Sequence, residues 1–221
     1  MKDRTLNVVV EFNSVDYFVS GDSAAGFQYE LCKYIGKRSG LSVQIFSESN
    51  FSLCIKGLLN NTYDIIARNI PITSETKKYL SFTVPVTISK QVLVQRKPDE
   101  KDSAQVFIHN QIDLANKTIY VPQNSAAILG LKNLSEEIAE PVYIREVSNN
   151  SSEDLIYMVY GKEIGYTVAD KALAEKVASR LPEIDYSVDI GFNQLQAWAL
   201  RPSSPILADS LNVWLSELPK K

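Results

Sequence analysis

Polar side chains follow a short apolar segment in the first half of the chain. Ile65, Ile66 and Ala67 predict a buried strand, and Arg68 and Asn69 come directly after it. In open α/β sheets, ligands bind beyond the carboxyl ends of the strands. A guanidinium and a carboxamide there suit a small polar ligand, and the guanidinium can hold a carboxylate through two hydrogen bonds. A surface or hinge salt bridge is the alternative role for Arg68.

Residues suited to catalysis are sparse. Glu11, Glu48 and Asp170 are the carboxylates that we consider as an acid or a base, and no paired-carboxylate, Ser-His-Asp or Cys-His constellation is evident. The only histidine, His109, stands in a polar stretch far from both cysteines. The sequence therefore predicts a binding protein rather than an enzyme, with no cofactor and no metal site.

Composition indicates an ordinary globular protein. The chain has 221 residues, of which 45% are hydrophobic and 22% charged, enough to build a sizeable core. The net charge of -3 and the scattered basic residues argue against nucleic acid as a partner. No apolar run approaches the roughly 20 residues of a membrane span, and no signal peptide is present. We expect a trimmed N-terminus, so the missing signal does not indicate the cytoplasm.

Two cysteines, Cys32 and Cys54, each stand in a helical pattern beside apolar residues. We favour two buried free thiols, because nothing else suggests a disulfide-rich scaffold. One disulfide between them is the alternative.

Hydrophobic patterning predicts alternating strands and helices in the first half of the chain. The expected strands are 6–11, 41–45 and 63–67, and the helices between them carry residues 27–35 and 54–59. This order implies parallel pairing with right-handed crossovers.

The pattern begins again after a strand at 91–95 and a polar stretch at 96–105. Further strands are expected at 118–121, 142–145 and 164–168, with helices at 126–131, 151–160 and 170–179. A strand at 195–200 and an amphipathic helix at 205–218 complete the chain, and Ser204 before Pro205 is a helix-start signal.

We predict an α/β fold of two lobes, each a mainly parallel sheet flanked by helices. Lobe 1 comprises residues 1–95 and 190–221, and lobe 2 comprises residues 96–189. The last helix returns to lobe 1, so the chain crosses twice. A cleft would lie at the hinge, with 91–95 and 186–190 as the segments that absorb the motion.

Several motifs resemble those of the bacterial extracellular solute-binding proteins of family 3. Gly26-Phe27 followed by Glu30-Leu31 matches the opening helix of that family, and its central signature matches at 63–66, 72–73 and 82–83. The resemblance covers nearly the whole chain. It implies a two-lobed, type II periplasmic-binding fold, a small-molecule ligand such as an amino acid, a periplasmic location and a monomer.

Four further segments, 67–75, 90–96, 166–170 and 196–201, look like the binding-protein-like domain of the membrane-bound lytic murein transglycosylase F family in its Bacteroidetes form. That resemblance implies a regulatory domain of a membrane-anchored cell-wall enzyme or lipoprotein. Its ligand would be an amino acid, a peptide or a muropeptide, and its partner a transglycosylase domain. The lysozyme-like catalytic domain of that family is absent, so we expect no glycan cleavage. The alternatives are a stand-alone protein that serves an ABC permease, a vestigial cleft used for protein interaction, or an enzyme on the same fold.

The resemblance suggests ligand-binding positions in the first lobe. Tyr17 and Phe51 would face each other across the ligand's side chain, or would be plain core aromatics. Arg68 and Asn69 lie where the family offers polar groups. The family's carboxylate-clamping arginine aligns on Thr76, whose hydroxyl cannot replace a guanidinium. Either Arg68 or the neighbouring Lys77 takes over the clamp, or the ligand is not an ordinary free amino acid.

The second lobe supplies two more candidates from the resemblance. Ser125, with the preceding Gln123 and Asn124, falls at a turn where a helix begins and an anion would bind. Asp170 aligns with the carboxylate that holds the ligand's ammonium group. A helix cap is the alternative role for both Ser125 and Asp170. We interpret Trp198 as a core residue.

Overall fold

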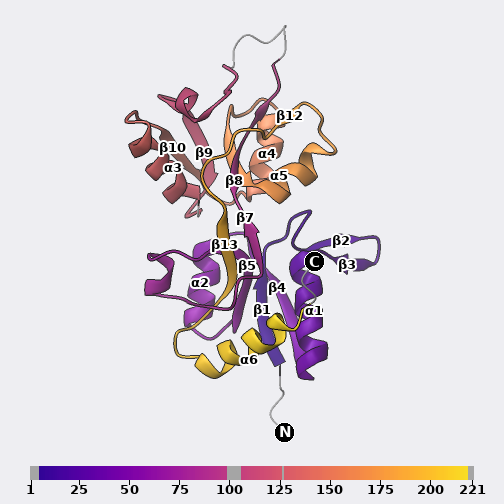
Figure 1. The fold of residues 1–221 in the computed structure, drawn as a ribbon. Helices are drawn as coiled ribbons and strands as arrows, with labels where there is room; N and C mark the ends of the chain where they lie inside the picture. The colour runs from indigo at the N-terminus through magenta and orange to yellow at the C-terminus, as the bar shows by residue number, and fades with distance from the viewer. Residues whose placement is uncertain (1–4, 99–105, 126, 219–221) are drawn as a thin grey trace. The chain divides into compact units, whose positions relative to one another are not determined.

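The computed structural model describes residues 5–98, 106–125 and 127–218 (Figure 1). The chain forms two compact units, Met1–Ile88 with Gln194–Lys221 and Ser89–Asn193. Most of the polar stretch at 96–105 and the expected helix start at 126 lie outside the described residues.

The first unit is built on a mixed sheet in the order β4-β1-β5-β13-β6, with β7 pairing to β13. β1 pairs in parallel with β4 and β5, whereas β13 runs antiparallel to β5 and β6. The strands are β1 (Thr5–Val10), β4 (Ser42–Ser47), β5 (Ile65–Pro71), β6 (Ser81–Phe82), β7 (Thr87–Ser89) and β13 (Gln194–Leu200). β2 (Phe18–Ser20) and β3 (Ser23–Ala25) form a separate hairpin.

Helices cover both faces of the first sheet. Consecutive residues of a strand point to opposite faces, so neighbouring residues of β1 contact different helices. Val8 and Val10 join a core cluster with Leu211 and Leu215, whereas Val9 joins a second cluster with Cys54 and Leu58. The helices are α1 (Phe27–Ser39), α2 (Phe51–Leu59), α6 (Pro205–Ser216) and a short 3-10 turn, η1 (Thr76–Lys78). Gly40 ends α1 in the left-handed conformation, at a φ of 69°.

The second unit has a sheet in the order β10-β9-β11-β8-β12. β9 lies between β10 and β11 in parallel, and β8 runs antiparallel to β11 and β12. The strands are β8 (Gln91–Arg96), β9 (Thr118–Pro122), β10 (Tyr143–Val147), β11 (Thr167–Asp170) and β12 (Ile184–Asp185). The helices are α3 (Ala127–Glu137), α4 (Ser152–Tyr160), α5 (Lys171–Ala178) and the short η2 (Gln111–Leu114).

The division between the units corrects the expected lobe boundaries. Residues 91–95, expected in lobe 1 and as a hinge, form β8 inside the sheet of the second unit. Their partner Val168 registers with Leu93, and both side chains lie in one core cluster. Ile190 also belongs to the second unit, because its N–H donates to the carbonyl of Gln91. The chain therefore crosses after Ile88 and after Asn193.

Cys32 and Cys54 are free buried thiols, as we favoured. Trp198 is fully buried in β13, in agreement with its interpretation as a core residue. None of the helices in the described part of the chain combines the length and hydropathy needed to cross a membrane.

Candidate functional site

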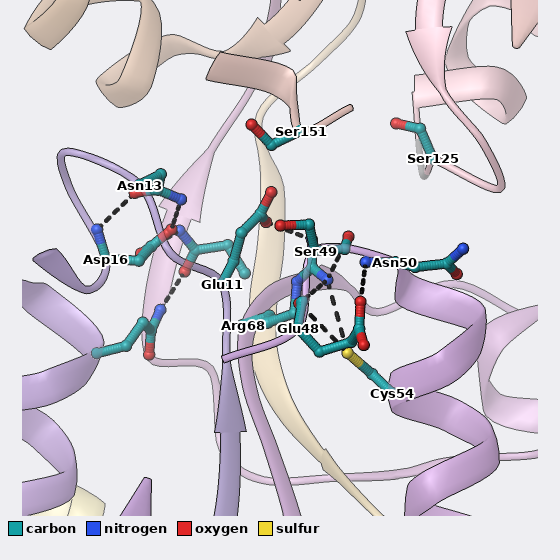
Figure 2. A network of polar contacts seen from close by, with 12 residues as sticks. Glu11, Asn13, Asp16, Glu48, Ser49, Asn50, Cys54, Arg68, Ser125 and Ser151 are labelled. Carbon is teal, nitrogen blue, oxygen red and sulfur yellow. Dashed lines mark hydrogen bonds and ion pairs between the residues drawn. The ribbon is translucent and has the colours of Figure 1, made fainter. Parts of the chain in front are cut away.

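The end of β1 and the middle of β5 bring Glu11 close to Arg68 in the first unit. Arg68 and Asn69, which we expected just after the strand, lie within β5, because β5 continues through Ile70 and Pro71 in pairing with β13. β1 and β5 are parallel neighbours, and Val10 registers with Ala67. Glu11 and Arg68 therefore each follow a paired residue, and their side chains form an ion pair (Figure 2). Only 13% of the Arg68 side chain and 16% of the Glu11 side chain are exposed.

The other guanidinium nitrogen of Arg68 is also engaged. Its Nη1 donates to the carbonyls of Ser49 at 3.2 Å and Glu48 at 3.4 Å, and lies 3.7 Å from the Cys54 sulfur (Figure 2). The guanidinium also lies over the Phe51 ring, 5.6 Å from its centroid. Arg68 thus ties the middle of β5 to the start of α2, and both of its Nη groups already have partners within the first unit.

Burial and charge act against each other in this cluster. Burial opposes the charge of Arg68, but the attraction of Glu11 and the hydrogen bonds to Cys54 and Glu11 outweigh it and raise the pKa of Arg68. Burial also raises the pKa of Cys54, although the nearby guanidinium acts in the opposite direction. Cys54 therefore stays a neutral thiol, which donates to the Glu48 carbonyl at 3.6 Å.

Asn69 has partners on two sides. Its Oδ1 accepts a hydrogen bond from Nε2 of Gln28 at 2.9 Å, and its Nδ2 lies 3.5 Å from Oδ1 of Asp16. The structure therefore joins Asn69 to α1 and to the loop after β1.

The two candidate aromatics belong to different contacts. Tyr17 packs against Phe12 and Tyr29, with ring centroids 5.8 Å apart in both pairs. It borders the core cluster that contains Val10, whereas Phe51 borders the cluster that contains Val9. Tyr17 and Phe51 therefore pack on opposite sides of β1.

Thr76 has a local role in η1. Its hydroxyl accepts a hydrogen bond from the Thr73 N–H at 3.0 Å and lies 3.1 Å from both the Thr73 hydroxyl and the Pro71 carbonyl. These contacts fix the turn after β5. Lys77, the other candidate clamp, is exposed on the same turn.

Ser125 lies at the start of α3 in the second unit, after β9. Its hydroxyl accepts from the Ala127 N–H at 3.2 Å, which is a capping contact. The N–H of Asn124, in the same turn, donates to the carboxylate of Glu146 at 2.8 Å. A protein carboxylate therefore already occupies one of the N–H groups that we expected to receive an anion.

Asp170 ends β11 and caps α5. Its Oδ1 accepts from the Ala172 N–H at 3.0 Å. Its Oδ2 is buried and has no hydrogen-bond partner among the described residues. A buried polar atom without a partner is uncommon and costly, and among the candidate residues this oxygen is the one that is buried without a hydrogen-bond partner in the described part of the chain.

Sequence reasoning missed three partners of the predicted site: Gln28, Asp16 and Glu146. It also considered Glu11 only as an acid or base, although strand pairing alone would place Glu11 beside Arg68. In the described ranges, no cluster of three or more histidine, cysteine, aspartate or glutamate side chains could hold a metal ion.

A family model and individual relatives both match nearly the whole chain. The model of the bacterial extracellular solute-binding proteins, family 3, matches residues 6–221. Membrane-bound lytic murein transglycosylase F of Shewanella loihica is 27% identical over 214 residues, which cover 96% of this chain and 43% of that protein. Its counterpart in Desulfosudis oleivorans is 25% identical over 211 residues, which cover 96% of this chain and 45% of that protein. The chain thus spans less than half the length of these curated relatives.

Solved structures confirm the predicted two-lobed α/β fold. The arginine-bound form of truncated ArgBP from T. maritima superposes with a TM-score of 0.83 at 23% identity, covering 98% of this chain and 97% of that one. The amino acid ABC transporter substrate-binding protein AbpA from Streptococcus pneumoniae, bound to L-arginine, gives a TM-score of 0.80 at 17% identity, covering 97% and 89%.

Proposed function

The chain belongs to the bacterial extracellular solute-binding proteins of family 3, and on this premise we propose that it closes on a small polar ligand such as an amino acid, a short peptide or a muropeptide. The family match along residues 6–221 is the observation that carries this proposal. The placement of the candidate residues supports it, because Glu11 and Ser125 follow β1 and β9 and Asp170 ends β11, where α/β sheets bind ligands.

In the intact protein, this module would regulate a membrane-bound lytic transglycosylase in the periplasm. The support is that the curated relatives of that name match 96% of this chain, while the match covers 43–45% of their own length. Ligand binding would then be coupled to glycan cleavage by another part of the same protein. A membrane anchor and cell-wall fragments as ligands are part of this proposal.

The charge balance in the first unit refines the ligand class. Glu11 already neutralises Arg68, whose guanidinium also bonds to backbone carbonyls. A free carboxylate would have to displace these contacts. We therefore favour a ligand whose carboxyl group is blocked, as in a peptide bond or an amide, at the position where the family clamps a carboxylate.

Asp170 is the proposed partner of a cationic group on the ligand. Its Oδ1 is used to cap α5, and its Oδ2 lacks a partner among the described residues. An ammonium group would satisfy that buried oxygen with a charge-assisted hydrogen bond.

An amino-acid-binding protein of an ABC importer is the second candidate function. One observation favours it: the superposition with ArgBP covers 97% of that protein as well as 98% of this chain. Arginine therefore belongs in any ligand screen, together with its amide.

A thermal-shift screen of the purified chain against free amino acids, amino acid amides, short peptides and muropeptides tests the proposal. A ligand that binds the native state raises the melting temperature by mass action, by several degrees at about 100 times its Kd. A selective rise with peptides or muropeptides supports the regulatory module, and a rise with free amino acids alone supports the importer. No rise with any class would contradict ligand binding and leave the protein-interaction alternative.

A further inference from the structure

A file of four hydrogen-bonded side chains leads from the core of the first unit toward the loop at residues 13–17. Nε1 of Trp198 donates to Oε1 of Gln28 at 2.6 Å, and Nε2 of Gln28 donates to Oδ1 of Asn69 at 2.9 Å. Nδ2 of Asn69 then lies 3.5 Å from Oδ1 of Asp16. Trp198 and Gln28 are fully buried, and Asp16 is 8% exposed.

The indole sets the direction of the whole file. Its N–H is a donor only, so the Gln28 side chain must turn its oxygen toward Trp198. The Gln28 NH2 group then faces Asn69, which must offer its oxygen there and turn its own NH2 group toward Asp16. One donor in β13 thus fixes the orientation of two amides, on α1 and within β5.

Asp16 has to accept from both sides. Its Oδ2 accepts from Nδ2 of Asn13 at 2.9 Å (Figure 2), while its Oδ1 faces Asn69. The Asn13 side chain cannot turn round, because its Oδ1 already accepts the N–H groups of Val15 and Asp16 at 2.9 and 2.7 Å. A carboxylate, which accepts through both oxygens, is therefore the side chain that fits at position 16.

The same loop docks on the start of α1. The N–H groups of Phe27 and Gln28 donate to the carbonyls of Val15 and Asp16 at 2.8 and 3.0 Å. Gly26 has a φ of 125°, and a Cβ there would lie 2.4 Å from the Asp16 carbonyl oxygen. The close approach therefore requires glycine. Tyr17, the candidate ligand-contacting aromatic, ends this loop.

We propose that Gln28 is a positioning residue for the ligand site: through Asn69 and Asp16 it holds the loop that carries Tyr17 in one conformation. This inference rests on the proposed function for its link to ligand affinity. The remaining hydrogen-bonding capacity of Asn69 would face the ligand in a single orientation, dictated by Trp198. The site in the first unit would thus be organised before the ligand arrives, which lowers the entropy cost of binding.

Reversing the direction of the file tests the proposal without any ligand. Gln28→Glu keeps the shape of the side chain and the acceptor for Trp198, and in its ionised form it has no donor for Asn69. Because burial raises the pKa of a carboxyl group, exchange is compared at several pH values up to the alkaline range. The Asn69 amide must then turn over, and its oxygen would face the Asp16 carboxylate. We expect amide hydrogen exchange at Asn13, Val15 and Asp16 to accelerate by about tenfold, as for one lost buried hydrogen bond, with exchange in β1 unchanged.

A double variant, Gln28→Glu with Asp16→Asn, provides the rescue. The Asn69 NH2 group then donates to the new carboxylate on α1, and the new amide in the loop donates to Asn69 while its oxygen accepts from Asn13. The file is complete again, with the two hydrogen bonds of Asn69 reversed, the bonds from Trp198 and Asn13 unchanged in direction, and the same net charge. We expect the double variant to recover the slow exchange of the loop. Gln44→Glu on the exposed β4 strand is the matched control for the added charge.

Faster exchange throughout the first unit, or no recovery in the double variant, would overturn the proposal, because both would indicate general destabilisation. Should Gln28→Glu not fold, Asp16→Asn alone must still accelerate exchange in the loop relative to β1. With a ligand from the screen, loop loosening must come with about tenfold weaker binding, and unchanged affinity would remove the positioning role. A failed ligand screen would contradict the proposed function but leave the exchange result standing.

Discussion

Arg68 and Glu11 form an ion pair because β1 and β5 are parallel neighbours whose last paired residues are Val10 and Ala67. The pair is nearly buried, and Arg68 also donates to two backbone carbonyls at the start of α2. The residue that the sequence presents as an anion clamp therefore holds β5 to the residue after β1 and to the start of α2. This assignment changes what a substitution at position 68 should do.

Arg68→Ala should lower the free energy of unfolding by about 3 kcal/mol, because it leaves the Glu11 carboxylate in a poorly solvated site without its partner. Urea denaturation monitored by circular dichroism measures this loss. Arg38→Ala is the matched control, since it removes an exposed pair with Glu217. A much smaller loss is expected there. Equal losses for both variants would show that Arg68 has no special structural role.

The same pairing predicts which ligands bind. An amino acid amide or a short peptide should bind at least as tightly as the corresponding free amino acid, because Arg68 is not available to a carboxylate. Isothermal titration of an acid and its amide measures the difference. We expect the Kd of the amide to equal or lie below the Kd of the acid, with about threefold as the margin of the comparison. A strong preference for the free acid would restore Arg68, or Lys77, as a clamp.

Asp170→Asn should weaken ligands that bear an ammonium group by about tenfold or more, because the substitution keeps a capping oxygen but removes the charge. N-acetylated versions of the same ligands should be affected far less. Asp154→Asn, in the first turn of α4, removes a charge from another helix start and serves as the control. Equal weakening of free and acetylated ligands would assign Asp170 to capping alone.

Thr76→Ala should cost about 1 kcal/mol of stability, because the hydroxyl holds the turn after β5 through Thr73 and Pro71. Ligand affinity should not change, since the hydroxyl already has these partners. Thermal denaturation and titration of the variant separate the two effects. A loss of affinity without a loss of stability would return Thr76 to the ligand site.

Cys32 should make stability fall at high pH. Burial raises the pKa of Cys32 from 9.0 to about 12. Above about pH 9, the unfolded chain therefore releases the thiol proton while the folded chain retains it, so unfolding becomes easier as pH rises toward 12. Cys32→Ala should flatten the dependence of the unfolding free energy on pH in this window. An unchanged slope would contradict the buried neutral thiol.

Much of the fold follows from the sequence because alternation and apolar runs mark the strands directly. The strand expected at 6–11 forms as β1 (Thr5–Val10), and its residues Val8, Val9 and Val10 lie in two core clusters. The lobe boundary was misplaced because β8 pairs with β11 and β12, far along the chain, and a local pattern carries no information on such partners.

The site was predicted less completely than the fold, for a similar reason. Arg68 and Asn69 were expected just after a strand but lie within β5, because Ile70 and Pro71 pair with β13. Their partners Glu11, Gln28 and Asp16 come from other elements. Only the register of β1 with β5 and the docking of α1 bring these groups together. Capping by Ser125 and Asp170 was predicted as the alternative role, because both residues stand at the starts of predicted helices.

The central claim, that this chain binds a small polar ligand at its strand ends, is tested most directly by a ¹H–¹⁵N NMR titration with the ligand that gives the largest thermal shift. The account predicts saturable changes at Glu11 and Asn69 in the first unit and at Ser125 and Asp170 in the second, all with one Kd. Saturable binding that leaves these four residues unperturbed, or no binding by any ligand class, would contradict it.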